Sequence, residues 1–239
     1  MTTATHATST NRLIAGLPSR QRRVFLAGCE RVHLDFARVL NRSGGKIRHV
    51  YFPLDGFISQ ITVLGNDRRL EVGIVGNEGM LGVSLMLGVA IAPQEAVVQG
   101  AGAALRMSAA IFQRHCRRSA ALRSILHRYT CVLIDQLAQN AACTHYHLID
   151  ERLARWLLMT RDRAHDDAFH LTHRFLAYML GVRRVGISQA ASALHRRGLI
   201  NYSRGRILIV DGPGLEKQSC ACYAEGKALY ERVLPGGKA

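Results

Sequence analysis

Acidic residues are scarce in this chain: 17 aspartates and glutamates stand against 32 lysines and arginines, which gives a net charge of +15 at pH 7. A basic excess of this size favours a polyanion, such as a nucleic acid or an acidic surface, as the partner. Between residues 171 and 210 there is no acidic residue at all, although seven arginines fall in that span. A surface cleared of acids predicts that this stretch contacts a polyanion.

Long apolar runs and secretion signals are missing too. The longest nearly apolar run, residues 79–92, has fourteen residues that include three glycines, and it is too short to span a bilayer. No basic segment followed by an apolar one stands near the N-terminus. The sequence therefore predicts a soluble, cytoplasmic protein with no membrane partner.

Catalytic signatures are also absent. The sequence contains no GxSxG, phosphate-binding loop, HExxH or paired carboxylates, and the first half has few acids to hold magnesium. We therefore expect that the chain is not an enzyme and needs no cofactor. A nucleic-acid-processing enzyme and a constitutive architectural DNA-binding protein are the competing classes, and the latter differs from a regulator only in lacking an effector.

Metal-ligating patterns are weak. Of six scattered cysteines only Cys220 and Cys222 are close together, and such a pair without a second one is a weak metal or redox signal. His145 and His147 lie two residues apart, on different faces of a helix, and are assigned to a hinge. A further group fits no strong metal motif and is expected to supply loop residues and helix caps: His165, Asp166, Asp167, His170 and His173.

The clearest pattern in the chain lies at residues 171–211. Thr172 can cap a helix whose apolar residues follow at helical spacing, and Gly181 then permits a tight turn. A second helix is expected from about Arg183, with a buried stripe of small and apolar residues, and Gly198 ends it. Residues 199–202 and 207–210 flank a basic hairpin tip at 203–205. Helix, turn, helix and hairpin predict a winged helix-turn-helix that binds DNA.

The first half has an apolar period of two. Strand-like segments at 32–36, 47–52, 57–64, 69–75, 95–99 and 103–107 are separated by turn residues, including those at 65–67. Short strands without long helices between them predict an antiparallel roll or barrel. The expected fold class is α+β, with a β-roll, sensor-like domain at 1–118, a long connecting helix at 119–147 and a winged helix-turn-helix domain at 148–239. Asp150 is expected to cap the first helix of that last domain, and a final helix over 215–234 to stop at Pro235.

The long helix carries a stripe with alternating steps of four and three residues, which is typical of a coiled-coil seam but also of a helix packed on its own domain. A second apolar face and the position beside a DNA-binding unit favour the dimer, because such units usually read two half-sites. The predicted dimerisation residues are Leu122, Leu126, Tyr129, Leu133, Gln136 and Asn140.

A β-roll, one long helix and a winged helix-turn-helix, in that order and size, resemble the Crp/Fnr family of bacterial transcription regulators. The likeness is strongest at LGVRR, AASALHRRGLI and SRGRILIVD. It implies a homodimer that binds a palindromic operator and contacts RNA polymerase, with Arg184, Val185 and Gln189 at the positions that meet bases. Val185 replaces an acidic residue common in the family. The predicted DNA-binding residues are Arg174, Arg183, Arg184, Val185, Ser188, Gln189, Ser192, Arg196, Arg204 and Arg206.

The sensor half departs from the members that bind cyclic nucleotides. These use a glutamate for the ribose and an arginine for the phosphate, where this chain has Val83 and Gln94, with Glu95 beside them. A buried phosphate without a cation would lose its hydration with no compensating partner. The iron–sulfur cluster of the oxygen-sensing members needs four cysteines, and only Cys29 lies near the N-terminus. The effector is therefore left open.

Cyclic AMP and cyclic GMP are predicted neither to bind nor to change DNA affinity, because Val83 and Gln94 supply no ribose acceptor and no phosphate cation. Titration calorimetry with each nucleotide tests this. A saturable signal at micromolar nucleotide would show that another residue provides the missing cation.

Overall fold

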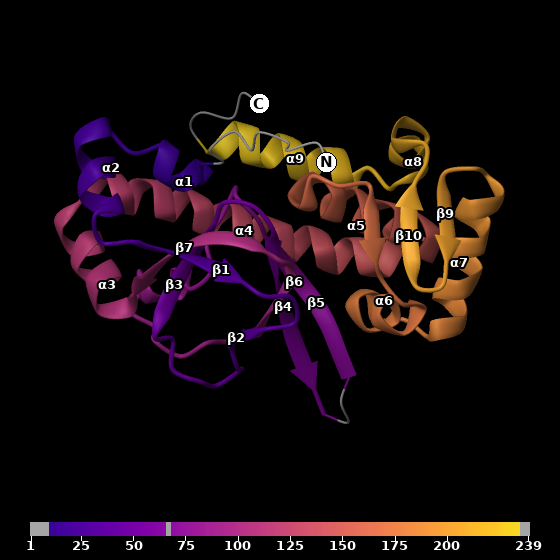
Figure 1. The fold of residues 1–239 in the computed structure, drawn as a ribbon, viewed down its shortest axis with the longest axis horizontal. Coiled ribbons are helices and arrows are strands. Elements are labelled where there is room, and N and C mark those ends of the chain that lie inside the picture. Colours follow the sequence, from indigo (N-terminus) through magenta and orange to yellow (C-terminus); the bar gives the residue numbers. More distant parts are fainter. Residues whose placement is uncertain (1–9, 66–67, 235–239) are drawn as a thin grey trace, which may run out of the picture. The chain divides into compact units, whose positions relative to one another are not determined.

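The computed structural model describes residues 10–65 and 68–234. The turn expected at 65–67 and the stop expected at Pro235 lie wholly or partly outside these residues. The fold is α+β, as the sequence predicts: antiparallel sheets occupy the first half, a long helix follows, and helices with a small sheet form the last part (Figure 1).

Two short helices open the described chain, α1 (Arg12–Ala15) and α2 (Ser19–Leu26). The side chain of Asn11 caps α1 by accepting hydrogen bonds from the backbone amides of Leu13 and Ile14. Its own amide group donates to the carbonyls of Pro53, at 3.1 Å, and Gly79, at 2.8 Å. A fully buried asparagine thus satisfies all its polar atoms while it fastens the first helix to the strands.

The strands of the first half are β1 (Glu30–Leu34), β2 (Val39–Asn41), β3 (His49–Pro53), β4 (Phe57–Leu64), β5 (Arg68–Val75), β6 (Glu95–Gly100) and β7 (Gly102–Ser108), with a 3-10 turn η1 (Val83–Leu85) before β6. They form two sheets with the orders β1-β7-β3 and β2-β6-β4-β5. In the first sheet β7 pairs antiparallel with both neighbours, so that Arg106 lies opposite Glu30 and also opposite Tyr51. Apolar residues from six strands and one loop fill the interior: Leu34, Tyr51, Ile58, Val75, Leu81, Ala96, Val98 and Ala104.

The helical part begins with α3 (Ala109–Arg118), which Ser108 caps as predicted, and α4 (Ala120–Tyr146). After it come α5 (Ile149–Ala164), β8 (Ala168–His170), α6 (His173–Leu180), α7 (Arg184–Arg196), β9 (Ile200–Ser203), β10 (Arg206–Ile209), α8 (Gly212–Gln218) and α9 (Cys222–Val233). The chain forms two compact units, and the division falls within α4, between Cys131 and Val132. Residues 59–65 and 68–74 belong with the C-terminal unit, and residues 231–234 with the N-terminal one.

Three local predictions in the C-terminal unit are wrong. Asp150 lies in the first turn of α5 instead of capping it, and the Glu151 carboxylate accepts the hydrogen bond from the Leu148 amide at 3.0 Å. The stretch at 165–173 contains a strand, β8, which pairs with β10. The single helix expected over 215–234 is broken, because Ser219 takes an extended conformation between α8 and α9.

The predicted seam of α4 faces its own chain. Leu122, Leu126 and Tyr129 are buried in the N-terminal unit, where the Tyr129 hydroxyl bonds both the amide and the carbonyl of Met80 at 3.2 Å. Further along, Leu133 is half-buried, Gln136 accepts a hydrogen bond from Tyr230, and Asn140 donates to the Val72 carbonyl at 3.0 Å. The stripe of step four and three is real, and the chain itself buries Leu122, Leu126 and Tyr129, whereas Leu133, Gln136 and Asn140 are partly exposed.

Among the described residues, no helix is both long and apolar enough to cross a membrane.

Candidate nucleic-acid interface

The turn between α6 and α7 forms as the sequence predicts. Thr172 caps α6 by accepting a hydrogen bond from the Phe175 amide at 3.2 Å. Gly181 ends the helix with φ of 65°, a conformation that favours glycine. The Val182 amide then donates back to the Ala177 carbonyl at 3.0 Å, and this closure of the helix end turns the chain toward α7.

A buried arginine of α5 holds this turn. Arg152 is only 8% exposed, and its guanidinium donates to the Leu180 carbonyl at 2.6 Å. That carbonyl is at the C-terminal end of α6, where the helix dipole favours a cation. Burial lowers the pKa of Arg152 from its usual value, with neighbouring Arg155 acting in the same direction. The charge of Arg152 thus serves the fold and is not available to DNA.

Helix α7 has one buried and one exposed face. Ile187, Ala190, Ala191 and Leu194 are buried, as the predicted stripe requires. The opposite face carries exposed residues at helical steps: Val185, Gln189, Ser192 and Arg196. Arg183 and Arg184, at the start of the helix, are exposed as well, and no side chain caps the first turn of α7. Uncapped backbone amides and two arginines at a helix N-terminus suit an anionic group.

Ser188 is the exception among the predicted contacts. It is half-buried, and its hydroxyl donates to the Arg184 carbonyl at 3.1 Å and bonds Nδ1 of His173 at 3.0 Å. The His173 ring also stacks on Tyr202 of β9, with ring centroids 4.2 Å apart. Burial lowers the pKa of His173, and nearby Arg184 lowers it further, which favours the neutral ring. Ser188 therefore joins α7 to α6 and the hairpin instead of pointing outward.

The β9–β10 hairpin lies next to α7 (Figure 1). Strands β9 and β10 pair with Ser203 opposite Arg206, so that only two residues, Arg204 and Gly205, form the loop. Both have positive φ, 48° and 80°, as a two-residue hairpin turn of the type that matches strand twist requires. Strand β8 pairs on the other side of β10, which makes the predicted two-stranded wing a three-stranded sheet.

The remaining arginines of the stretch differ in freedom. Arg206 is exposed on β10. Arg174 is exposed on α6 and lies over the Tyr178 ring, 5.8 Å from its centroid. Arg197 donates to Gln218 of α8 and so contributes to packing. Nine of the ten predicted DNA-binding residues are thus exposed side chains on α6, α7 and the hairpin.

Comparisons with known proteins agree with this geometry. The family model of the Crp-like helix-turn-helix domain matches residues 151–218, from the first turn of α5 to the end of α8. The comparison with curated proteins gives no match.

Several solved structures share the fold. FixK2 from Bradyrhizobium japonicum has a TM-score of 0.67 at 15% identity, over 81% of this chain and 98% of that one. The c-di-GMP responsive global regulator CLP of Xanthomonas campestris gives 0.66 at 15% identity, over 80% and 99%. A Crp-family transcriptional regulator of Thermus thermophilus gives 0.65 at 16% identity, over 79% and 96%. Residues 151–218 are thus a Crp-like helix-turn-helix domain, and the chain shares its fold with these solved structures.

Several residues that shape this interface are not recognisable from the sequence alone. Arg152 lies in α5 and was not distinguished from the exposed arginines, because periodicity does not show which charged residue is buried. The sequence predicts that His173 belongs to the group of loop and cap residues at 165–173. Its stacking partner, Tyr202, is 29 residues further along the chain. The only usable signal was the position of His173 directly after the Thr172 cap, which places it in the first turn of α6.

A glutamate of β5 that contacts α5 has a raised pKa. Glu71 of β5 accepts hydrogen bonds from the Trp156 indole, at 2.7 Å, and from the hydroxyl of Ser59. It lines a cavity of about 280 Å³ together with residues of α4, α5 and α6. Burial raises the pKa of Glu71 to about 7, although both hydrogen bonds and the charges of Arg163 and Arg155 oppose the shift. The ionised form is therefore disfavoured in the folded chain.

This shift predicts a pH-dependent stability. The pKa of Glu71 in the folded state lies above the value of about 4.3 for an unfolded glutamate. At pH values between these two pKa values, the folded state therefore binds more protons than the unfolded state. The free energy of unfolding should fall by at most about 3.5 kcal/mol as pH rises from about 4.5 to 7, and should level off above that. The single tryptophan, Trp156, reports urea unfolding of this unit by fluorescence.

Glu71→Gln should flatten that part of the pH profile, because the amide cannot ionise. Glu231→Gln, at an exposed position of α9, is the matched control and should leave the slope as in the wild type. An unchanged slope in Glu71→Gln would contradict the assignment of the shift to this carboxylate.

Proposed function

We propose that the chain acts as a homodimer that binds a palindromic duplex site, with α7 in the major groove and the β9–β10 hairpin on the backbone. The observation that carries this is the exposed face of α7, rich in polar and arginine side chains and without an acid, beside an arginine-tipped hairpin. Dimers of such units read two half-sites about 10–10.5 base pairs apart, or a multiple of that distance.

Specificity is assigned to the start of α7. Arg184 is its first residue, and a guanidinium can donate two hydrogen bonds to the O6 and N7 atoms of guanine. Gln189 lies on the same exposed face and can pair with adenine in a similar way. Val185 is 60% exposed, and an exposed valine here suits the methyl group of thymine.

Affinity is assigned to the arginines around that helix. Arg204 and Arg206 on the hairpin, Arg174 on α6, and Arg183 and Arg196 at the ends of α7 are exposed and suited to phosphates. Ser192 lies on the exposed face of α7, between Gln189, which is assigned to bases, and Arg196, which is assigned to phosphates. Ser188 is reassigned from base contact to positioning, because its hydroxyl is held by His173.

The dimer is proposed to form on the other face of α4. Cys131, Ile134 and Ala138 are exposed at steps of three and four, and Ile134 is 60% exposed. His127, Ala141 and His145 continue this exposed stripe in both directions. An apolar residue in the middle of an exposed stripe with coiled-coil spacing suits a second copy of the same helix. By the resemblance, RNA polymerase is a further partner, and the N-terminal sheets would receive an effector of unidentified chemistry.

The roles of Arg184 and Arg204 differ in a measurable way. Arg184→Ala should weaken binding to a site selected from random duplexes by about 1–3 kcal/mol and weaken binding to scrambled DNA much less, because base contacts are lost. Arg204→Ala should weaken both similarly and lower the salt dependence of log K by roughly one unit. Fluorescence anisotropy at several salt concentrations measures both quantities.

Arg23→Ala is the control. Arg23 is an exposed arginine on α2, so this substitution removes the same charge outside the interface. It should change neither specificity nor salt slope by a comparable amount. Equal losses on both duplexes for Arg184→Ala would mean that Arg184 contacts only phosphate.

Ile134→Glu should raise the dissociation constant of the dimer at least about tenfold, which corresponds to 1.4 kcal/mol, because two carboxylates would meet at the dyad. Analytical ultracentrifugation measures it. Val24→Glu, which replaces an exposed apolar residue of α2, should leave the dimer unchanged.

Leu126→Glu separates the two faces of α4. Leu126 has no exposed surface in the N-terminal unit, so this variant should lose thermal stability before any effect on association is seen. A stable Leu126→Glu monomer together with a dimeric Ile134→Glu protein would place the dimer interface on the predicted seam of α4 that contains Leu126. A monomeric wild type at micromolar concentration would refute the dimer.

A further inference from the structure

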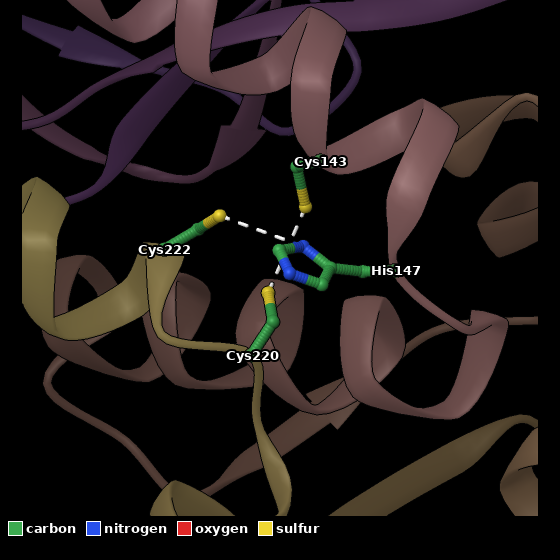
Figure 2. A group of neighbouring side chains, drawn as sticks. All are labelled: Cys143, His147, Cys220 and Cys222. Atoms are coloured by element: carbon green, nitrogen blue, oxygen red, sulfur yellow. Dashed lines mark hydrogen bonds between the residues drawn. The ribbon is translucent and has the colours of Figure 1, made fainter.

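Four sulfur and nitrogen ligands meet in the C-terminal unit. Cys143 lies in the last turn of α4 and His147 directly follows that helix, whereas Cys220 lies in the break before α9 and Cys222 begins α9 (Figure 2). Their ligand atoms all lie within 4.8 Å of one another. Figure 2 shows the imidazole pointing into the space between the three sulfurs.

Local structure explains how two distant segments supply these groups. The His147 amide donates to the Cys143 carbonyl at 3.1 Å, so the helical hydrogen bonding continues past α4 and keeps both side chains on one face. On the other side, the extended conformation of Ser219 interrupts the helix, and Cys220 and Cys222 then point toward the end of α4. The weak CxC signal thus becomes part of a four-ligand group that the sequence spacing does not show.

Ordinary core packing does not account for this cluster. The three cysteines are buried, with 1%, 7% and 6% of their surface exposed, and all are free thiols. The packing of small cysteines in an apolar core does not require a polar imidazole ring, yet Nδ1 of His147 lies 3.6 Å from Sγ of Cys222. Sγ of Cys143 and Sγ of Cys220 are also 3.6 Å apart.

These separations match the edges of a metal tetrahedron. Zinc–sulfur bonds of about 2.3 Å and a zinc–nitrogen bond of about 2.0–2.1 Å, at tetrahedral angles, put ligand sulfurs about 3.8 Å apart and sulfur and nitrogen about 3.6 Å apart. Both measured edges are close to these values, and the widest pair needs to close by only about 1 Å.

The charge around the cluster also suits a metal thiolate centre. Three thiolates and one divalent ion carry a net negative charge, and Arg155 of α5 donates to Sγ of Cys143 at 3.5 Å. The same guanidinium donates to the Asn140 side chain at 2.6 Å, which fixes its position. Outer partners of this kind orient ligands and tune metal affinity.

We propose that Cys143, His147, Cys220 and Cys222 bind one zinc ion. A closed tetrahedral site with three thiolates and one imidazole is a structural zinc site, because no coordination position is left for substrate. The ion joins the end of α4 to the start of α9 within the C-terminal unit. Binding releases the thiol protons and stabilises that unit, since an unfolded chain has no preformed site.

Metal analysis of the untagged full-length protein, purified without chelator, tests the proposal. Plasma mass spectrometry should find about one zinc per chain in the wild type. Cys220→Ser and Cys222→Ser should each retain less than a tenth of that, whereas Cys29→Ser, at a half-buried cysteine before β1, should retain all of it. Replacing zinc by cobalt should give the visible bands of a tetrahedral thiolate complex in the wild type and in the control, but not in Cys220→Ser or Cys222→Ser.

Variants of His147 keep the test independent of folding failures. His147→Ala should lose zinc, and His147→Cys should recover it, because four thiolates also form a tetrahedral zinc site. A side chain that only packed in a core would not give this pattern. Removing zinc with a strong chelator should lower the melting temperature of the wild type and leave Cys220→Ser unchanged.

Three results would overturn the proposal. The first is a wild type that takes up no zinc at micromolar concentration with its thiols reduced. The second is iron with acid-labile sulfide, which would make the group a cluster site. The third is a Cys143–Cys220 disulfide in the native protein, which would make the pair a redox element.

Discussion

The hydrogen bond from Arg152 to the Leu180 carbonyl is the contact on which the helix-turn-helix of this chain depends. It places a buried cation from α5 at the end of α6, directly before the left-handed Gly181. A hydrogen bond from a charged group contributes about 1.5–3 kcal/mol, and its loss would leave a guanidinium buried without a partner. Because the turn sets the direction of α7, the orientation of every exposed side chain on that helix follows from it.

The arginines of the C-terminal unit are divided between structure and function by their surroundings. Arg152 donates to a backbone carbonyl, and Arg155 donates to a side-chain amide and a thiol. Arg184 and Arg204, in contrast, are exposed. No acid between residues 171 and 210 competes for the exposed group. The fold thus uses its buried cations to fix the helices, and leaves its exposed ones to a polyanion.

Sequence reasoning succeeded where a local pattern decides the structure. The Thr172 cap, the Gly181 turn and the Arg204–Gly205 hairpin depend on residues within one turn or one hairpin, and all three form. It failed where the partner is distant. Spacing shows that Leu126 and Tyr129 lie on one face of α4, but not that their own chain covers that face. Likewise, Cys143 and Cys220 meet only because α8 and α9 are separate helices.

The central claim is that α7 reads base edges through Arg184, and a thermodynamic cycle on both partners tests it most directly. Each guanine of the selected site is replaced by 7-deazaguanine, which lacks the N7 acceptor, and binding is measured for the wild type and for Arg184→Ala. The account predicts one guanine per half-site at which the two changes are coupled by about 1–3 kcal/mol, so that the base change matters only when Arg184 is present. Additive losses at every guanine would contradict it.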